Sequence, residues 1–149
     1  MRFIVIAIGH NIPTWVDAGF NEYAKRLPAM ELIALKPAKA GNKAAILQAE
    51  CRQINAACPK SCTRIVLDSL GKCYTTLELA AELEKWMAYG KDLAFILGGA
   101  EGLHPSLKLQ TPIWSLSPLT LPHGLARIVV AEQLYRATSL LQHHPYHRA

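Results

Sequence analysis

The chain has 149 residues, of which 51% are hydrophobic, and its composition does not shift along its length, so we expect a single domain over residues 1–149. A formal net charge of +5 suits a polyanionic partner such as a nucleic acid but does not require one. No apolar stretch approaches the length of a membrane span and the N-terminus lacks the pattern of a signal peptide, so we expect a cytoplasmic protein with no membrane partner. The four cysteines contain no CxxC pair, and we expect reduced thiols without disulfides or zinc.

Short apolar runs alternate with helical patterns along the chain. Five such runs occupy residues 3–8, 31–35, 64–67, 93–97 and 113–116. Brief, nearly continuous apolar runs are typical of parallel strands that are buried on both faces. The sequence therefore predicts an α/β fold with a five-stranded parallel sheet and helices on both faces.

Helical patterns fill the segments between these runs. We expect helices over residues 14–26, 43–57, 75–90 and 125–141. Capping boxes, with a Thr followed three residues later by an acid, would open the first at Thr14 with Asp17 and the third at Thr75 with Glu78. Gly90 suits the end of the third helix, because glycine readily adopts the left-handed conformation found there.

The last predicted helix carries more apolar surface than one stripe requires. Glu132 and Arg136 form an i,i+4 pair on one face. Another face gathers Leu125, Ile128, Val129, Tyr135 and Leu141, and Val130, Leu134 and Leu140 extend the apolar surface beyond it. This pattern indicates a helix buried on two sides, for which a dimer interface and a deeper core position are equally open interpretations.

Two loops follow the fourth and fifth predicted strands. The first reads Gly98-Gly99-Ala100-Glu101-Gly102, and the second covers residues 117–124. Because ligands of open α/β sheets bind beyond the carboxyl ends of the strands, we expect the two loops to be neighbours around one crevice. The first lacks both the GxGxxG order of a dinucleotide site and the Lys-Ser/Thr of a P-loop, so neither NAD nor a nucleoside triphosphate is indicated. A tight turn with no ligand is the alternative.

The C-terminal tail concentrates polar groups, since residues 143–148 read His-His-Pro-Tyr-His-Arg. A metal cluster is disfavoured because the proline breaks helical spacing and no carboxylate lies nearby. Two readings remain open. The tail is a solvated chain end, or it reaches over the crevice, where Tyr146, His147 and Arg148 would supply a stacking ring, a titratable base and a fixed cation.

Short motifs are distributed over essentially the whole chain: Met1-Arg2-Phe3, Pro13-x-Trp15, Gly19-Phe20-x-Glu22-Tyr23, Leu67-Asp68, Gly98-Gly99-x-Glu101-Gly102, Leu121-Pro122-His123, Glu132-Gln133-Leu134-Tyr135-Arg136-Ala137 and Pro145-Tyr146-His147-Arg148. Together they resemble the bacterial large-subunit rRNA pseudouridine N3-methyltransferases, small members of the SPOUT class. Their order and spacing, rather than any single motif, carry the resemblance.

The resemblance implies a specific fold and reaction. The fold would be a five-stranded parallel domain whose C-terminal part is threaded into a deep trefoil knot, working as a homodimer. S-adenosyl-L-methionine would be the methyl donor, with no metal. By matching position, the donor would contact Leu67, Gly99, Leu116, Ser117, Pro118, Leu119, Thr120 and Leu121. The methyl group would pass to N3 of a pseudouridine in a stem-loop of 23S rRNA within the assembled ribosome, with no DNA partner.

The residue types in the tail agree with that chemistry. Methyl transfer requires near-attack geometry, and a base and a cation near the ring help as the N3 proton leaves. We expect His147 to remove that proton and Tyr146 to stack on the base. Arg148 or Arg136 would stabilise charge on the carbonyl oxygens. The rival hypothesis is that the tail only anchors RNA and that solvent takes the proton.

Basic residues near the expected mouth of the site are candidates for RNA contact. They are Lys25, Arg26, Lys36, Lys39 and Lys43. Contact with phosphates would make binding sensitive to salt. For each lysine taken singly, a solvated surface position is an equally good interpretation.

The sequence departs from the family pattern at three places. Ala100 stands where the family usually has proline, the segment 36–43 is less basic than expected, and Pro118 removes a backbone N–H from the donor loop.

Two other function classes stay open. One is a ribosome-associated binding protein without catalysis, and the other a metal-dependent hydrolase that uses His143, His144 and His147.

Overall fold

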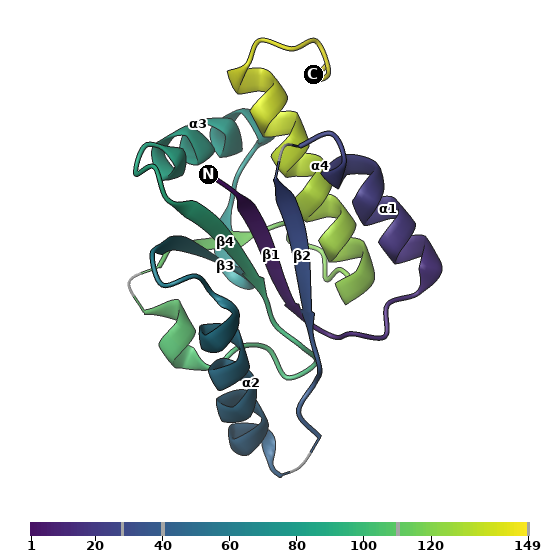
Figure 1. Ribbon diagram of the computed structural model, residues 1–149, viewed down its shortest axis with the longest axis vertical. Helices are drawn as coiled ribbons and strands as arrows, with labels where there is room; N and C mark the ends of the chain where they lie inside the picture. Colours follow the sequence, from purple (N-terminus) through teal and green to yellow (C-terminus); the bar gives the residue numbers. More distant parts are fainter. Residues whose placement is uncertain (28, 40, 110, 149) are drawn as a thin grey trace.

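A sheet of five parallel strands forms the centre of the protein (Figure 1). The computed structural model describes residues 1–27, 29–39, 41–109 and 111–148. The strands are β1 (Phe3–Ile8), β2 (Met30–Leu35), β3 (Cys62–Cys73), β4 (Asp92–Leu97) and β5 (Ile113–Ser115), in the order β2-β1-β4-β3-β5. Every neighbouring pair is parallel, which confirms the predicted α/β sheet.

Helices cover both faces of this sheet, also as predicted. They are α1 (Thr14–Ala24), α2 (Lys43–Ala57), α3 (Thr76–Met87) and α4 (His123–Leu141), with a short 3-10 helix at Pro105–Lys108. Side chains of α1, α3 and α4 share one core cluster with Phe3, Phe95 and Trp114. Those of α2 and the 3-10 helix share a second cluster with Ile4, Ile6 and others on the opposite face. The alternation of β1 residues between two cores explains its unbroken apolar run.

Strand β3 is longer than the sequence predicts. The apolar run ends at Leu67, but the strand continues through a polar stretch to Cys73. Its pairing with β5 shifts register between Leu67 and Lys72. In this stretch a Cβ on Gly71 would lie 2.6 Å from the carbonyl oxygen of Ile113, so the close approach to β5 requires glycine.

The predicted helix starts have different outcomes. Thr75 accepts a hydrogen bond from Glu78 N–H while Glu78 caps Thr75 N–H, which confirms the capping box of α3. The box at Thr14 is wrong, because Pro13 occupies the N-cap position and Thr14 is already helical. Proline is well suited there, since its missing N–H would have no partner in the first turn. Helix α3 ends at Met87, and Gly90 follows with a φ of 71°.

Helix α4 lies between α1 and α3 (Figure 1). Its deeply buried side chains are Val130, Ala131, Leu134 and Ala137, all 0% exposed. The stripe that the sequence indicates from Leu125 to Leu141 is instead exposed or half-buried. The apolar surface beyond the first stripe therefore forms the deepest core contact, while Tyr135 and Leu141 of the stripe pack against the same core at its margin. The trefoil-knotted path implied by the resemblance stays a prediction.

Candidate active site

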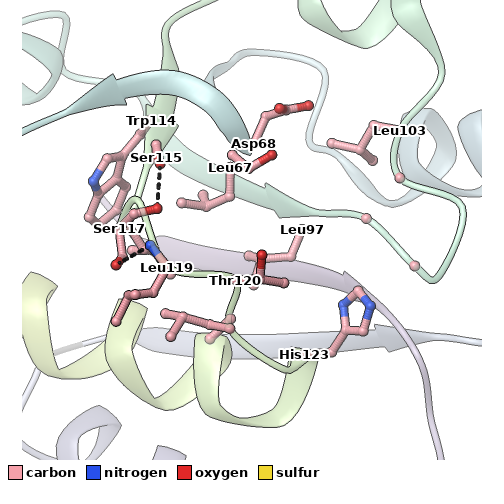
Figure 2. Close-up of a pocket in the computed structure, with 17 residues that line it drawn as sticks. Leu67, Asp68, Leu97, Leu103, Trp114, Ser115, Ser117, Leu119, Thr120 and His123 are labelled. Carbon is pink, nitrogen blue, oxygen red and sulfur yellow. Dashed lines mark hydrogen bonds between the residues drawn. The ribbon is translucent and has the colours of Figure 1, made fainter.

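A cavity of about 240 Å³ opens where β4 and β5 end, beside the middle of β3 (Figure 2). Parallel strands bring their carboxyl ends to one edge, where α/β proteins bind ligands. Leu67 lies midway along β3, where its pairing with β5 shifts register, Leu97 closes β4, and Trp114 belongs to β5. His123, the first residue of α4, forms part of the same wall. The two loops expected to be neighbours thus meet at one crevice.

Seven of the eight residues predicted to contact a donor line this cavity: Leu67, Gly99, Leu116, Ser117, Leu119, Thr120 and Leu121. Pro118 is not among its lining residues. The chain turns at this point through local hydrogen bonds, because Ser115 Oγ donates to the carbonyl of Ser117 at 3.1 Å and Leu119 N–H donates to Ser117 Oγ at 2.9 Å. The loop between β5 and α4 is therefore held in shape by its own serines.

The glycine loop after β4 folds back on itself at the cavity wall. Gly99 and Gly102 form an isolated β-bridge, and Gly102 has a φ of 83°. A Cβ on Gly98 would lie 2.5 Å from the carbonyl oxygen of Gly102, too close for any side chain. This loop needs glycine for its own tight path, and that path brings backbone to the cavity surface.

Asp68 lies at the rim of the cavity and is fixed by neighbours (Figure 2). Its Oδ1 accepts a hydrogen bond from Leu70 N–H at 2.8 Å, and Oδ2 pairs with Lys108 Nζ. Burial alone would raise the pKa of Asp68, but the hydrogen bonds from Lys108 and Leu70 outweigh it and hold the pKa below its ordinary value. The carboxylate is thus kept charged at the mouth.

A second group of predicted residues gathers at the far end of α4. Glu132 Oε1 lies 2.8 Å from Arg136 Nε and 2.7 Å from its Nη2. The same oxygen accepts a hydrogen bond from the Tyr146 hydroxyl at 3.2 Å. Arg136 also lies 4.6 Å from the centroid of the Tyr146 ring and 3.3 Å, through Nη1, from His147 Nδ1. Three predicted catalytic residues, Arg136, Tyr146 and His147, therefore form one cluster, while Arg148 is exposed beside them.

Charge shapes the ionisation of this cluster. The hydrogen bond to Glu132 raises the pKa of Arg136, so the guanidinium stays protonated. Burial, followed by the nearby Glu132 carboxylate, raises the pKa of Tyr146. Because a guanidinium only donates, Arg136 is the donor in its contact with His147 Nδ1.

Within one chain the tail cluster does not reach the cavity. Arg136 lies thirteen residues beyond His123 on α4, or about 20 Å at 1.5 Å per residue. In Figure 1 the segment after α4 lies at the upper end of this helix, opposite the end at which α4 begins. The two groups of predicted residues therefore stand at opposite ends of α4.

Two buried charged residues went unrecognised in the sequence. Glu50 on α2 is 5% exposed, and its Oε1 has no hydrogen-bond partner among the described residues. Arg127 on α4 is 4% exposed, and its Nη1 is likewise unpartnered within the described ranges. Hydrophobic periodicity counts both as surface residues, so only their place on buried helix faces could have signalled them.

The candidate RNA-binding residues separate into two groups. Lys25 and Arg26 pair with Glu22 at 3.0 and 2.8 Å, so part of their charge is neutralised. Lys36, Lys39 and Lys43 are exposed around the start of α2. Ala40, inside the expected basic loop, lies outside the described residues.

Over the described ranges, no group of three or more His, Cys, Asp or Glu side chains could hold a metal ion. No helix in the same part of the chain is long and apolar enough to cross a membrane. All four cysteines are free thiols.

A family model described as "Predicted SPOUT methyltransferase" matches residues 1–147. The chain belongs to the SPOUT methyltransferase family. The match extends over every helix and strand of this SPOUT methyltransferase domain, from β1 to the tail cluster.

Named relatives agree with this membership. "Ribosomal RNA large subunit methyltransferase H" of Ralstonia pickettii (strain 12J) is 48% identical over 155 residues, covering 99% of each chain. The protein of the same name from Nitrosospira multiformis is 49% identical over 156 residues, covering 100% of each. The solved SpoU methyltransferase AviRb from Streptomyces viridochromogenes, in complex with AdoMet, superposes with a TM-score of 0.50 at 12% identity. That superposition covers 92% of this SPOUT chain and 58% of the other, and shows the fold alone.

Proposed function

We propose that this protein is an S-adenosylmethionine-dependent methyltransferase that acts on N3 of a pseudouridine in 23S rRNA. Its substrate would be the assembled ribosome in the cytoplasm, and its working form a homodimer. The observation that carries the proposal is the cavity at the ends of β4 and β5 and beside the middle of β3, which seven of the eight expected donor contacts line. The choice of 23S rRNA as the methyl acceptor is supported by the relatives named for large-subunit rRNA methylation, which are 48 and 49% identical over essentially their whole lengths.

The residues present fit an adenosyl donor. Leucines and Trp114 give the cavity apolar walls that suit a flat aromatic base, while the glycine loop brings backbone groups to its surface. Asp68, Ser117 and Thr120 add a few polar side chains at the rim. When bound, S-adenosylmethionine supplies a sulfonium methyl group that a nitrogen nucleophile can displace in line. The protein therefore has to position the two reactants and manage one proton.

The tail cluster suits the proton and the charge that this reaction generates. As the N3 proton leaves, negative charge spreads onto the flanking carbonyl oxygens. Arg136 would move from His147 Nδ1 to one of those oxygens, and this frees Nδ1 to accept the proton. Tyr146 would stack on the base, and the exposed Arg148 would contact phosphate or a second carbonyl.

A second copy of the chain would bring the tail to the donor cavity. Arg136 is fixed on α4 about 20 Å from His123, so the cluster that it forms with Tyr146 and His147 does not reach the cavity within one chain. In an antiparallel pair of α4 helices, related by a two-fold axis, each tail would lie beside the partner's cavity. Apolar surface is available near the cavity, because Trp15 is 59% exposed and Leu125 38% exposed. The Trp15 ring passes 3.8 Å from where a Cβ on Gly124 would lie, next to His123.

The direct test is methyl transfer from labelled S-adenosylmethionine to ribosomes from a strain that lacks this protein. Free 23S rRNA and an RNA-free reaction serve as comparisons. We expect label only with ribosomes, in a nucleoside that mass spectrometry identifies as N3-methylpseudouridine. His147→Ala should lose activity while it retains donor binding, and Lys60→Ala, at an exposed residue that belongs to neither group, should behave like wild type. Label in uridine or in protein, or none with any acceptor, would overturn the proposal.

A further inference from the structure

A second cavity of about 290 Å³ adjoins the first. It is lined by the loop after β1, by Pro37 and Ala100, and by the first turns of α1 and α4. Gly99 and His123 line both cavities, so the two share a wall. These two residues are therefore where a single ligand would pass from one cavity to the other.

Arg127 is the charged group of this second cavity. Its Nη2 donates to the carbonyl oxygens of Ile8 at 3.2 Å and Gly9 at 2.8 Å. Gly9 permits this contact, because a Cβ there would lie 2.8 Å from Nη2. Nη1, in contrast, is buried without a partner among the described residues. A buried, unpaired N–H of a guanidinium is costly, and a ligand oxygen would recover that cost.

The two cavities differ in the charges that they offer. The first is lined by two titratable side chains, Asp68 and His123, and by no lysine or arginine. The carboxylate of an adenosyl donor confined to it would meet no lysine or arginine in the lining. The lining of the second contains a cation, Arg127, and no acid.

We propose that Arg127 binds the carboxylate of the donor's methionyl end through Nη1, with that end lying in the second cavity. The inference rests on the proposed function, since it assumes an adenosyl donor in the first cavity. The sulfonium would then lie where the cavities meet, near Gly99 and His123. Arg127 would be a specificity residue for the donor, because it selects molecules that carry a carboxylate.

The test compares donors that differ only in this group. Isothermal titration calorimetry on the full chain would use S-adenosylmethionine and decarboxylated S-adenosylmethionine, with 5′-methylthioadenosine as the ligand that lacks the whole amino-acid end. A ligand that makes a hydrogen bond between two charged groups binds about 10- to 100-fold more tightly than one that lacks it. We expect wild type to prefer the carboxylated donor by this factor, and Arg127→Met to lose the preference without weaker binding of methylthioadenosine.

Two further variants keep the test decisive. Arg52→Met changes an exposed arginine on α2 and serves as the matched control, with wild-type affinities expected. If Arg127→Met fails to fold by circular dichroism, Ile12→Trp replaces it, because Ile12 lines the second cavity and not the first. That variant should weaken binding of S-adenosylmethionine and leave binding of methylthioadenosine unchanged.

The possible results separate the two proposals. Equal affinity of wild type for the carboxylated and decarboxylated donors would overturn the role of Arg127 and leave the proposed function standing. Unchanged donor affinity in Arg127→Met, with methyl transfer lost, would assign Arg127 to the acceptor and also overturn it. No binding of any adenosyl compound would refute the proposed function itself.

Discussion

Glu132 holds Arg136 through one carboxylate oxygen, with Oε1 lying 2.8 Å from Nε and 2.7 Å from Nη2. The same oxygen receives the Tyr146 hydroxyl, so a single acid on α4 fixes both a candidate oxyanion group and a candidate stacking ring. The tail after α4 is thereby folded back onto the helix. We conclude that Glu132 positions the tail cluster.

Replacing Glu132 with Gln should release this cluster. Removing an anion near Tyr146 favours its phenolate, so the pKa of Tyr146 should fall, as an ultraviolet titration against Tyr146→Phe would show. Methyl transfer should fall about tenfold, equivalent to about 1.4 kcal/mol, with donor affinity unchanged. Glu82→Gln, which disrupts an exposed ion pair with Lys85 on α3, is the matched control. An unaltered Tyr146 titration would show that Glu132 does not organise the tail.

Mixing two inactive variants should restore activity if the site combines two chains. Thr120→Trp would fill the donor cavity, and His147→Ala would remove the candidate base. In a mixed dimer one site combines the intact cavity of one copy with the intact tail of the other. After random exchange about a quarter of the wild-type sites should recover, measured as methyl transfer. Leu125→Arg, on the exposed apolar surface of α4, should prevent both dimer formation and this recovery of activity. Light scattering reports the oligomeric state. Recovery of methyl transfer in a protein that is monomeric would contradict the composite site.

Gly98→Ala should damage the donor cavity. The added Cβ would lie 2.5 Å from the Gly102 carbonyl oxygen, which is backbone and cannot rotate away. We expect a cost of about 1 to 3 kcal/mol in the free energy of unfolding, and donor binding at least tenfold weaker by calorimetry. Gly90→Asn is the comparison: the φ there is 71° and a Cβ meets open space, so asparagine should be tolerated. Wild-type donor affinity in Gly98→Ala would mean that the loop does not shape the site.

The local pattern of apolar, capping and turn residues was sufficient to predict much of the fold. The apolar run of β1 and the bounds of α2 were predicted residue for residue, and the glycine loop was correctly placed at the crevice. These features depend on burial, capping and turn chemistry that neighbouring residues encode. The extension of β3 to Cys73 was missed because its residues are polar and gain their strand conformation from pairing with β5. Such pairing is a property of the tertiary structure.

The parts of the site that could not be predicted from the sequence also depend on the tertiary structure. Arg127 was assigned to no role because its charge suggests the surface, although it reaches the carbonyl groups of Ile8 and Gly9, more than a hundred residues away. The structure brings Tyr146 and His147 of the tail motif beside Arg136 of α4, a contact that no spacing in the sequence predicts. The distance of this cluster from the donor cavity depends on the direction of α4, which no spacing in the sequence reveals.

Acid should destabilise the rim of the cavity through Asp68. Its pKa lies below the ordinary value when folded, so the stability it contributes is present above the unfolded pKa and is lost as pH falls through the folded value, below about pH 4. Asp68→Asn should reduce the free energy of unfolding at neutral pH by about 1 kcal/mol and make little difference in strong acid. Urea unfolding at both pH values measures this. An equal loss at both would point to packing rather than charge.

The cysteines should differ in reactivity according to burial. Cys73 is exposed at the end of β3, whereas Cys51 and Cys58 are buried. Burial raises the pKa of the Cys58 thiol to about 11, and only the thiolate reacts with iodoacetamide. Native protein at mild alkaline pH should therefore be alkylated first at Cys73, with Cys58 protected until the protein unfolds, as peptide mass spectrometry would report. Rapid labelling of Cys58 in the native state would show that the junction between α2 and β3 opens far more readily than its packing indicates.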